Sequence, residues 1–348
     1  MSTDYMGTAV GLAGELDTSS GDISAGATSL LPSAEAQPPI DHPVISVDGL
    51  TKDYGHGRGV FDVSFQVGKG EVFGFLGPNG AGKTTTIRHL MGFAAPQRGH
   101  TSILDMDCWK QSSRIIRQVG YLPGEIALPE GLTGMQFIRF MQGMRGYRDE
   151  ERLNTLLDLF QLDPRGKTKR MSLGNKRKLA VVTAFMGDPD VLLLDEPSSG
   201  LDPIMQLRFI DFMRQEKSRG KTILLSSHMF SEVGAVCDRI AIIKDGRIVS
   251  TVRTDDIRHN ESKTYHVGFG TLEDFQSFLS GRGPRITFAD QEEKVIEVQI
   301  HDDDVNHLIS RLAQCNVTRF QERKLTLEDY FLHFYTRDPQ ESTHESRH

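Results

Sequence analysis

A short glycine-rich motif between a predicted strand and a predicted helix constrains this chain more than any other feature. Residues 77–85 are Gly-Pro-Asn-Gly-Ala-Gly-Lys-Thr-Thr and match the pattern G-x-x-x-x-G-K-[ST]. Residues 71–76 before it form a short apolar strand pattern, and apolar residues at helical spacing follow Lys83. Glycines let backbone N–H groups turn toward phosphate oxygens, and the N-terminus of the next helix adds a positive dipole end. The motif therefore predicts a phosphate-binding loop in an α/β fold.

The residue types of this loop have separate predicted roles. Lys83 is expected to meet the β- and γ-phosphates of a nucleotide, and the hydroxyl of Thr84 is expected to bind Mg²⁺. An ordinary Gly-rich turn is the alternative, but it does not explain the strand and helix on either side. The residues predicted to bind the nucleotide are Gly77, Pro78, Asn79, Gly80, Ala81, Gly82, Lys83, Thr84 and Thr85.

Two acidic residues follow a second apolar strand. Residues 191–194 are Val-Leu-Leu-Leu, and Asp195 and Glu196 come directly after them. A continuous apolar run is typical of a strand buried on both faces of a parallel sheet. Asp195 is expected to hold Mg²⁺ from the outer coordination sphere of the ion. Glu196 is expected to polarise the attacking water as a general base. Without the phosphate-binding loop, an exposed acidic turn would explain both residues as well.

Length and pattern indicate two folded parts between two tails. The chain has 348 residues, which suits about two domains. Strands alternate with helices over residues 43–258 and predict an α/β domain with a largely parallel sheet. Residues 1–42 contain acidic residues and many small ones, and residues 337–348 also lack a hydrophobic period, so both tails are predicted to be disordered.

A smaller part is predicted at residues 262–336. Its strands and helices alternate as β-α-β-β-α-β and are followed by one more helix, which predicts a small ferredoxin-like α+β domain. The strands are expected at 265–269, 285–288, 295–300 and 317–321, and the helices at 271–280, 302–314 and 326–335.

Charge and hydropathy exclude several classes of protein. The net charge of −7, from 40 basic and 47 acidic residues, argues against a general nucleic-acid binder, so no nucleic acid partner is expected. No stretch approaches the roughly 18 consecutive apolar residues that a membrane-spanning helix needs. The first residues also lack the basic and apolar regions of a signal peptide.

Over residues 44–250, the order of motifs resembles that of the ATP-binding subunits of ABC transporters. Residues 171–175, Met-Ser-Leu-Gly-Asn, are similar to the family's Leu-Ser-Gly-Gly-Gln signature and differ from it at three positions. The retained Ser172 and Gly174, with Asn175, are implied to touch the γ-phosphate bound by a partner subunit. A serine before a helix also suits an anion site. The resemblance implies an ABC-type P-loop NTPase fold with a helical subdomain at about residues 125–187.

The resemblance assigns roles to further residues. His228 follows an apolar strand at residues 222–226 and resembles the switch histidine that contacts the γ-phosphate, so that Glu196 and His228 form the implied catalytic pair. Tyr54 lies where the family stacks an aromatic ring on adenine, although an aromatic residue at the end of a strand is more often part of the core. The residues that resemble the D-loop, which crosses the dimer interface, are Ser199, Gly200, Leu201 and Asp202.

One position departs from the family pattern. After a Gly-Tyr-Leu-Pro strand at residues 120–123, the family has a glutamine that ligates Mg²⁺ and senses the membrane partner. Here that position is Gly124, and Glu125 follows it. Glycine has no side chain to ligate an ion, and it stays open whether Glu125 compensates from a position shifted by one residue. The charged segment 175–178 is expected to be a solvated helix face.

The first functional hypothesis is an ATPase that energises an exporter. Two copies, or this chain and a related ATP-binding subunit, would hold ATP and Mg²⁺ at a head-to-tail interface and hydrolyse the ATP. They would drive a transmembrane permease on a separate chain, as peripheral subunits at the cytoplasmic face of the membrane. Residues 325–331 are similar to the C-terminal extension of ATPase subunits in bacterial drug and antibiotic exporters, which favours drugs, antibiotics or lipophilic compounds as cargo.

The alternative hypothesis is a soluble ABC-type ATPase that acts on ribosomes or DNA. The family's members that act on ribosomes have two such domains in one chain, whereas this chain has one phosphate-binding motif. DNA-repair relatives insert a long coiled coil between that motif and the acidic strand, but no sustained heptads separate Lys83 from Asp195. A third hypothesis, an ATP-binding regulator without hydrolysis, would require that the general base be missing, and Glu196 is present.

Overall fold

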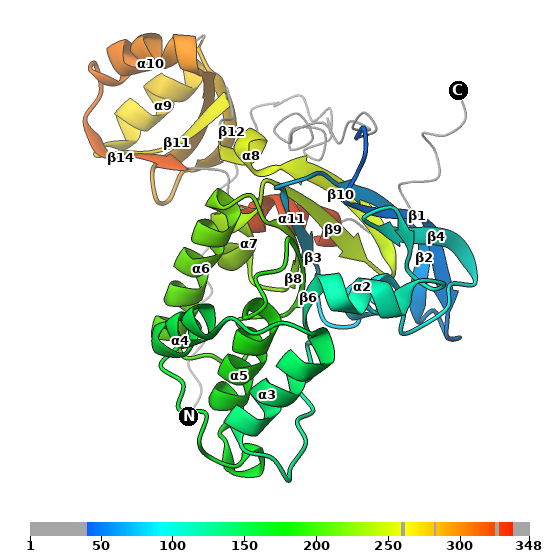
Figure 1. Cartoon of the computed structure of the whole chain (residues 1–348). Helices are drawn as coiled ribbons and strands as arrows, with labels where there is room; N and C mark the ends of the chain where they lie inside the picture. Colours follow the sequence, from blue (N-terminus) through cyan, green and yellow to red (C-terminus); the bar gives the residue numbers. More distant parts are fainter. Residues whose placement is uncertain (1–39, 259–261, 282, 324–326, 337–348) are drawn as a thin grey trace, which may run out of the picture. The chain divides into compact units, whose positions relative to one another are not determined.

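The computed structural model describes residues 40–258, 262–281, 283–323 and 327–336. In this part the chain forms two compact units, drawn in Figure 1. The smaller unit holds Thr264–Gln321, and the larger unit holds the described residues up to Lys263 and from Glu322 onward. Apart from residues 40–42, the two predicted disordered tails lie outside the described residues.

A six-stranded sheet forms the centre of the larger unit. Strand β3 pairs in parallel with β8 and β9, and β7 pairs in parallel with β6 and β8, while β10 is antiparallel to β9. Every residue of β3, β7 and β8 is buried, as their continuous apolar sequences predict. In sheet order the strands are β10 (Arg247–Arg253), β9 (Arg239–Lys244), β3 (Val72–Leu76), β8 (Thr222–Ser227), β7 (Val191–Asp195) and β6 (Val119–Leu122).

A second, antiparallel sheet of the larger unit was not foreseen in the sequence analysis. Its strands, in order, are β2 (Gly59–Val67), β1 (Ile45–Asp53), β4 (Arg98–Ile103) and β5 (Met106–Asp107). The first three residues of β4 are exposed, so this strand carries little hydrophobic pattern. The apolar side chains of the antiparallel sheet share one core with the central sheet. In this core the rings of Phe65 on β2 and Phe73 on β3 stack with their centres 5.1 Å apart.

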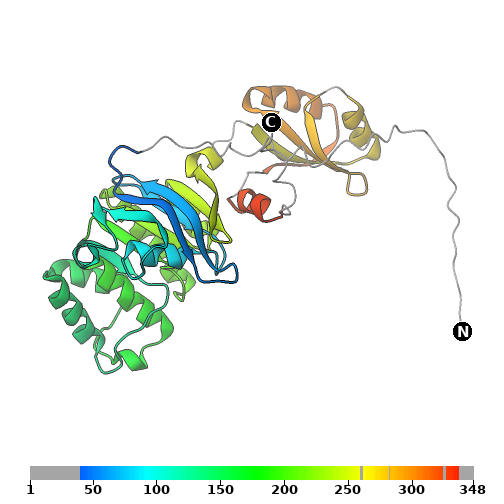
Figure 2. The ribbon, with the colours of Figure 1, turned by 90° about the vertical axis from the view of Figure 1, so that its right-hand side faces the viewer.

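The helices of the larger unit fall into two sets. Figure 2 shows the helical subdomain, in green, at one end of this unit and the first strands, in blue, at the other. Side chains of Thr133, Asp149 and Ser172 accept hydrogen bonds from first-turn N–H groups and so begin the three helices of the subdomain. These helices are α3 (Gly134–Arg145), α4 (Glu150–Leu159) and α5 (Leu173–Phe185), and the others are α1 (Lys83–Leu90), α2 (Ser112–Gln118), α6 (Pro203–Ser218), α7 (Phe230–Val236), α8 (Thr254–Arg258) and α11 (Leu327–Thr336).

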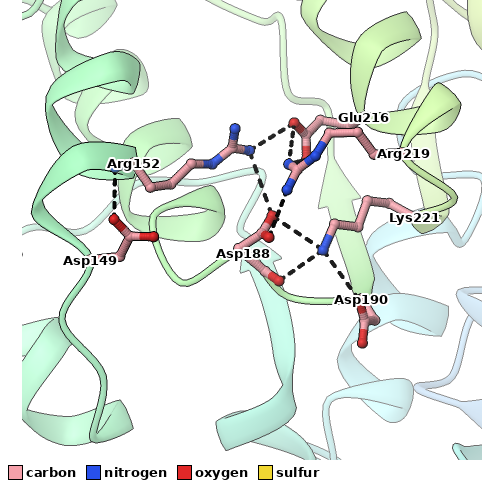
Figure 3. Close-up of polar contacts among 7 residues, drawn as sticks. All are labelled: Asp149, Arg152, Asp188, Asp190, Glu216, Arg219 and Lys221. Atoms are coloured by element: carbon pink, nitrogen blue, oxygen red, sulfur yellow. Dashed lines mark hydrogen bonds and ion pairs between the residues drawn. The ribbon is translucent and has the colours of Figure 1, made fainter.

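A network of charged side chains ties the helical subdomain to the rest of the larger unit (Figure 3). Glu216 of α6 is buried, 2.7 Å from Arg152 of α4 and 2.9 Å from Arg219. Arg219 and Lys221 also pair with Asp188, which precedes β7. Burial alone would raise the pKa of Asp188, but hydrogen bonds from Arg219 and Lys221 outweigh burial and hold that pKa below its ordinary value. The network therefore joins α4 to the C-terminal end of α6 and to the segment before β7.

The last helix, α11 (Leu327–Thr336), belongs to the larger unit. This differs from the sequence analysis, which grouped residues 262–336 as one accessory domain. Tyr330 is 1% exposed, and its hydroxyl lies 2.8 Å from the hydroxyl of Ser250 on β10. The ring of Phe331 packs edge-on against Phe230 of α7 at 4.9 Å. The apolar side of α11 is therefore buried by β10 and α7.

The smaller unit is a four-stranded sheet with strand order β12-β13-β11-β14. Its elements follow the predicted order, and its core contains Val267, Phe275, Val298 and Leu308. The elements are β11 (Ser262–Phe269), α9 (Leu272–Ser280), β12 (Arg285–Asp290), β13 (Val295–His301), a 3-10 turn (Asp302–Asp304), α10 (Val305–Leu312) and β14 (Val317–Arg323). Within the described residues, no helix combines the length and the apolar composition needed to cross a bilayer.

Candidate active site

The predicted phosphate-binding loop lies between the end of β3 and the start of α1. A Cβ atom at position 77 would lie 2.5 Å from the carbonyl oxygen of Ile243, so only glycine fits there. Gly82 has a φ of 112°, and a Cβ atom on it would lie 2.7 Å from Val60 Cγ1. Both glycines are therefore required by geometry. The first turn of α1 carries no acidic residue, which keeps the helix N-terminus favourable for an anion.

Lys83 connects this loop to the predicted general base. Its side chain is 5% exposed, and Nζ donates to the carbonyl oxygens of Gly77 at 2.5 Å and Pro78 at 3.2 Å. The same nitrogen lies 3.1 Å from Oε1 of Glu196. The structure thus brings two residues that are far apart in the sequence into one ion pair beside the loop.

Glu196 and His228 lie against each other beside the loop. Glu196 Oε2 lies 2.6 Å from Nδ1 of His228. Glu196 has a φ of 50°, a left-handed conformation that costs an L-residue about 1–2 kcal/mol. Such strain is retained where surrounding contacts enforce it, often at functional sites. The Glu196 side chain is 16% exposed and that of His228 is 48% exposed, so solvent reaches the pair.

Asp195 and Thr84 offer oxygen atoms to a divalent cation. Asp195 is fully buried, and its Oδ1 accepts a 2.5 Å hydrogen bond from the hydroxyl of Ser226. Its Oδ2 is buried and has no hydrogen-bond partner among the described residues. Thr84 is exposed in the first turn of α1. A carboxylate and a hydroxyl are the oxygen ligands that Mg²⁺ prefers, so the residues present fit this ion.

The loop after β6 contacts Arg177, whose burial differs from what the sequence predicted. Glu125 is exposed. Arg177, in the segment expected to be a solvated face, is instead 4% exposed. Its guanidinium donates to the carbonyl oxygens of Pro123 at 3.0 Å, Gly124 at 2.7 Å and Ser199 at 2.8 Å. Burial lowers the pKa of Arg177, while nearby carboxylates oppose that effect. The signal that was missed is helical spacing, because Arg177 lies three residues before the buried Ala180.

The signature residues and the D-loop form a second group. Ser172 and Asn175 are exposed, and the Ser172 hydroxyl accepts a hydrogen bond from the Asn175 N–H at 3.2 Å. A Cβ atom on Gly174 would lie 3.2 Å from the carbonyl oxygen of Gly200. Asp202 begins α6 by accepting a hydrogen bond from the N–H of Met205, and Leu201 is buried while Ser199 is half-buried. The start of α5 and the D-loop are therefore neighbours.

Tyr54 directly follows β1 and is not a core residue. Its side chain is 57% exposed, and Nζ of Lys52 lies 5.8 Å from the centre of its ring. An exposed ring beside a cation keeps a face accessible for stacking.

Glu232 is a buried acid near this site that the sequence analysis missed. It is 1% exposed, and its Oε2 accepts a 2.6 Å hydrogen bond from the Ser227 hydroxyl, which itself accepts one from the N–H of Met229 at 3.0 Å. Burial raises the pKa of Glu232 to about 7. The Ser227 hydroxyl thus links the Glu232 carboxyl to the main chain of Met229, on the other side of His228.

Comparisons with known proteins show which proteins this chain is similar to. A family profile described as "ABC transporter" matches residues 60–199. An uncharacterized ABC transporter ATP-binding protein of Bacillus subtilis, YhcH, is 30% identical over 86% of this chain and 99% of that protein. The bacitracin transport ATP-binding protein BcrA of Bacillus licheniformis is 29% identical over 83% of this chain and 96% of that protein. The Nod factor export ATP-binding protein I of Paraburkholderia xenovorans is 32% identical, over 85% and 98% respectively.

Solved structures share the fold of the larger unit. The structure of an ATP-binding subunit of an ABC transporter aligns with a TM-score of 0.58 and 33% identity, covering 62% of this chain and 92% of that one. A dimeric ATP-binding cassette bound to ADP and phosphate aligns with a TM-score of 0.56 and 20% identity, covering 60% and 98%, and so shares the fold.

Proposed function

The chain belongs to the ATP-binding proteins of ABC transporters, and on that premise we propose that two subunits hydrolyse ATP at shared sites to drive a separate membrane permease. The family membership accounts for ATP binding and hydrolysis. We further propose a role for each site residue, a docking surface for the permease and a direction of transport.

The phosphate-binding loop is proposed to hold the triphosphate. Residues 77–85 would surround it with backbone N–H groups, and Tyr54 would stack on adenine. Lys83 supports this role, since its ammonium group already lies among carbonyl oxygens of the loop. Thr84 and Asp195 would hold Mg²⁺, which when bound neutralises negative charge on the β- and γ-phosphates.

Glu196 is proposed to accept a proton from the attacking water while the bond from the γ-phosphorus to the bridging oxygen breaks. The single observation that carries this role is the position of the Glu196 carboxylate, 3.1 Å from Lys83 and 2.6 Å from His228. Lys83 marks where the phosphates would lie, and His228 would orient the carboxylate. A positioned general base contributes about 10²–10⁴-fold to a rate.

A second subunit is proposed to complete each site. Ser172, Gly174 and Asn175 lie at the N-terminus of α5, whose positive dipole end suits an anion. Leu173 between them is 67% exposed, and Ile204 and Leu207 after the D-loop are 68% and 64% exposed. Exposed apolar side chains beside an exposed helix N-terminus support contact with another ATP-binding subunit across this face. ATP would stabilise that contact because only the closed pair uses both sets of residues.

A hydrophobic groove in the larger unit is proposed to receive a helix of the permease. The groove has a volume of about 500 Å³. Its apolar lining comes from the end of α1, from α2, from the loop after β6 and from α3, and includes Ile116, Ile126, Phe137 and Met141. The proposed place of this chain is therefore peripheral, at the cytoplasmic face of the membrane. The names of the bacitracin and Nod factor relatives support export as the direction.

The test of this proposal is the variant Glu196→Gln in the full chain. It is expected to bind ATP as the parent does, to lose at least about 100-fold in steady-state hydrolysis, and to form an ATP-dependent dimer in size-exclusion chromatography. A matched control is Glu151→Gln, because the Glu151 carboxylate is exposed on α4, outside the proposed site. Hydrolysis at the parental rate by Glu196→Gln would remove Glu196 as the general base. A monomer at saturating ATP would contradict the shared site.

A further inference from the structure

The sequence analysis left one departure unexplained, the glycine at position 124. We propose that Arg177 is a positioning residue that links the loop around Gly124 to the D-loop, so that a helix bound in the hydrophobic groove sets the geometry of the hydrolytic site. This inference rests on the proposed function and names how that site is controlled. It assigns a role to the buried arginine, which the proposed mechanism does not use.

The hydrogen bonds of Arg177 define the link. One guanidinium nitrogen donates to Pro123, a second to Gly124, and the third to Ser199 in the D-loop, all within 3.0 Å. All three acceptors are main-chain carbonyl oxygens, so the contact fixes backbone position. A planar guanidinium presents its donors in a rigid fork, which a lysine ammonium cannot reproduce across two loops.

The burial of Arg177 makes this link stiff. The side chain is 4% exposed, and a buried charge is tolerated only while its hydrogen bonds are made. Asp195, Glu196 and Glu232 attract the guanidinium without contacting it. Moving either loop away would leave a buried cation underbonded. The two loops are therefore expected to move together, with the start of α5.

Gly124 places this link between the groove and the metal-binding acid. Its neighbours Pro123 and Ile126 line the groove. A Cβ atom at position 124 would lie 2.9 Å from Oδ2 of Asp195, closer than real Cβ contacts allow. A side chain at this position would therefore displace the carboxylate. With glycine there, the connection from the groove runs through the main-chain carbonyl of Gly124 to Arg177 and on to Ser199.

The test compares Arg177→Lys and Arg177→Met with Arg152→Met in the full chain. Arg152 is a matched control because it is a mostly buried arginine, 17% exposed, in the same helical subdomain, and its partner is Glu216 at 2.7 Å. Thermal unfolding reports the structural cost of each change. The kcat and KM for ATP, per folded molecule, report the site.

Both Arg177 variants are expected to lower kcat by about 10–100-fold, because a small misplacement of a reacting group has an effect of this size. The KM for ATP is expected to change less than about twofold, because Arg177 lies outside the proposed phosphate-binding loop. Arg152→Met is expected to lower the unfolding temperature but to keep the parental kcat. Parental kcat in Arg177→Lys and Arg177→Met would overturn the inference. So would equal losses of kcat in Arg177→Met and Arg152→Met, because the role would then be structural support alone.

A second readout separates this inference from the proposed function. In a Glu196→Gln background, ATP-dependent dimer formation is measured with and without Arg177→Lys. The added change is expected to weaken ATP-dependent dimerisation at least about fivefold, because Ser199 belongs to the loop that would cross the interface. Equal dimerisation of the single and double variants overturns the role of Arg177. Absence of any dimer in Glu196→Gln alone overturns the proposed function instead.

Discussion

At the scale of single residues, three side chains lie together at the candidate site. Nζ of Lys83 lies 3.1 Å from Oε1 of Glu196, and Nδ1 of His228 lies 2.6 Å from Oε2 of the same carboxylate. Glu196 adopts a left-handed backbone conformation, which turns it away from the direction that β7 would otherwise give it. In the proposed mechanism, Lys83 would exchange its contact with Glu196 for one with the triphosphate.

The change Lys83→Ala tests this arrangement. It is expected to raise the dissociation constant for ATP at least about tenfold, since a charge-assisted contact to phosphate contributes roughly 1.5–3 kcal/mol. Isothermal titration with ATP measures the effect. Lys110→Ala, at a side chain that is 80% exposed, serves as the control and should bind as the parent does. Equal affinities for the two variants would contradict the phosphate role of Lys83.

Glu232 predicts a pH dependence of stability. Burial raises its pKa to about 7, above the ordinary value of 4.5, so the folded chain binds a proton more tightly than the unfolded chain. The stabilisation from that proton is complete below pH 4.5 and is lost as the pH rises through 7. Glu196, His228 and the hydroxyls of Ser198 and Ser227 are the groups that act on this carboxyl.

The free energy of unfolding of Glu232→Gln, relative to that of the parent, is therefore expected to increase from pH 5 to pH 8. The difference is at most about 3 kcal/mol, from 1.36 kcal/mol for each unit of pKa. Urea unfolding of both chains at the two pH values measures it. A parent-to-variant difference that stays constant with pH would show that Glu232 is ionised throughout this range.

At the scale of elements, side-chain packing places helix α11 in the larger unit. Its sequence position, after the small sheet, favoured the accessory domain. The buried Tyr330 and the contact between Phe331 and Phe230 instead attach it to β10 and α7. Since α7 begins two residues after His228, α11 supports the helix that follows the predicted switch.

The change Tyr330→Ala tests this attachment. Removal of a fully buried aromatic side chain is expected to cost about 3–5 kcal/mol of stability in the larger unit. Differential scanning calorimetry should show the loss in the transition of that unit. Leu332→Ala is the matched control in the same helix, because Leu332 is 53% exposed and should change stability by less than about 0.5 kcal/mol. Equal effects of the two changes would place α11 outside the core.

Elements with strong local patterns were predictable, and elements defined by tertiary contacts were not. Helix α3 (Gly134–Arg145) has a strong local pattern, because its capping box and its apolar spacing agree. The predicted strands that became β7 and β8 have an apolar centre and are buried along their whole length. By contrast, β4 has a weak pattern and exists because β1 pairs with it along its length. Arg177 looked solvent-facing because its carbonyl partners lie on distant loops.

At the scale of the whole molecule, the candidate site divides into two groups of residues. The first comprises the phosphate-binding loop, Glu196 and His228, and the second comprises the start of α5 and the D-loop. The phosphate-binding loop and Glu196 were named from local motifs in the sequence, whereas His228, the signature residues and the D-loop were named from the resemblance to the family. The partner subunit that would meet the second group was implied by the resemblance alone, and its contact with this group stays a prediction.

The most direct test of the shared site is a mixing experiment with Lys83→Ala and Ser172→Glu. Each variant alone is expected to be inactive, the first because it lacks the phosphate-binding lysine and the second because it places negative charge where the partner's phosphate would lie. A pair of unlike copies would hold one site with an intact lysine and an intact serine. Mixing is therefore predicted to restore ATP hydrolysis to roughly a quarter of the parental rate, the share expected from random pairing of two copies. Continued inactivity of the mixture, with dimers of unlike copies demonstrated by affinity tags, would contradict the shared site.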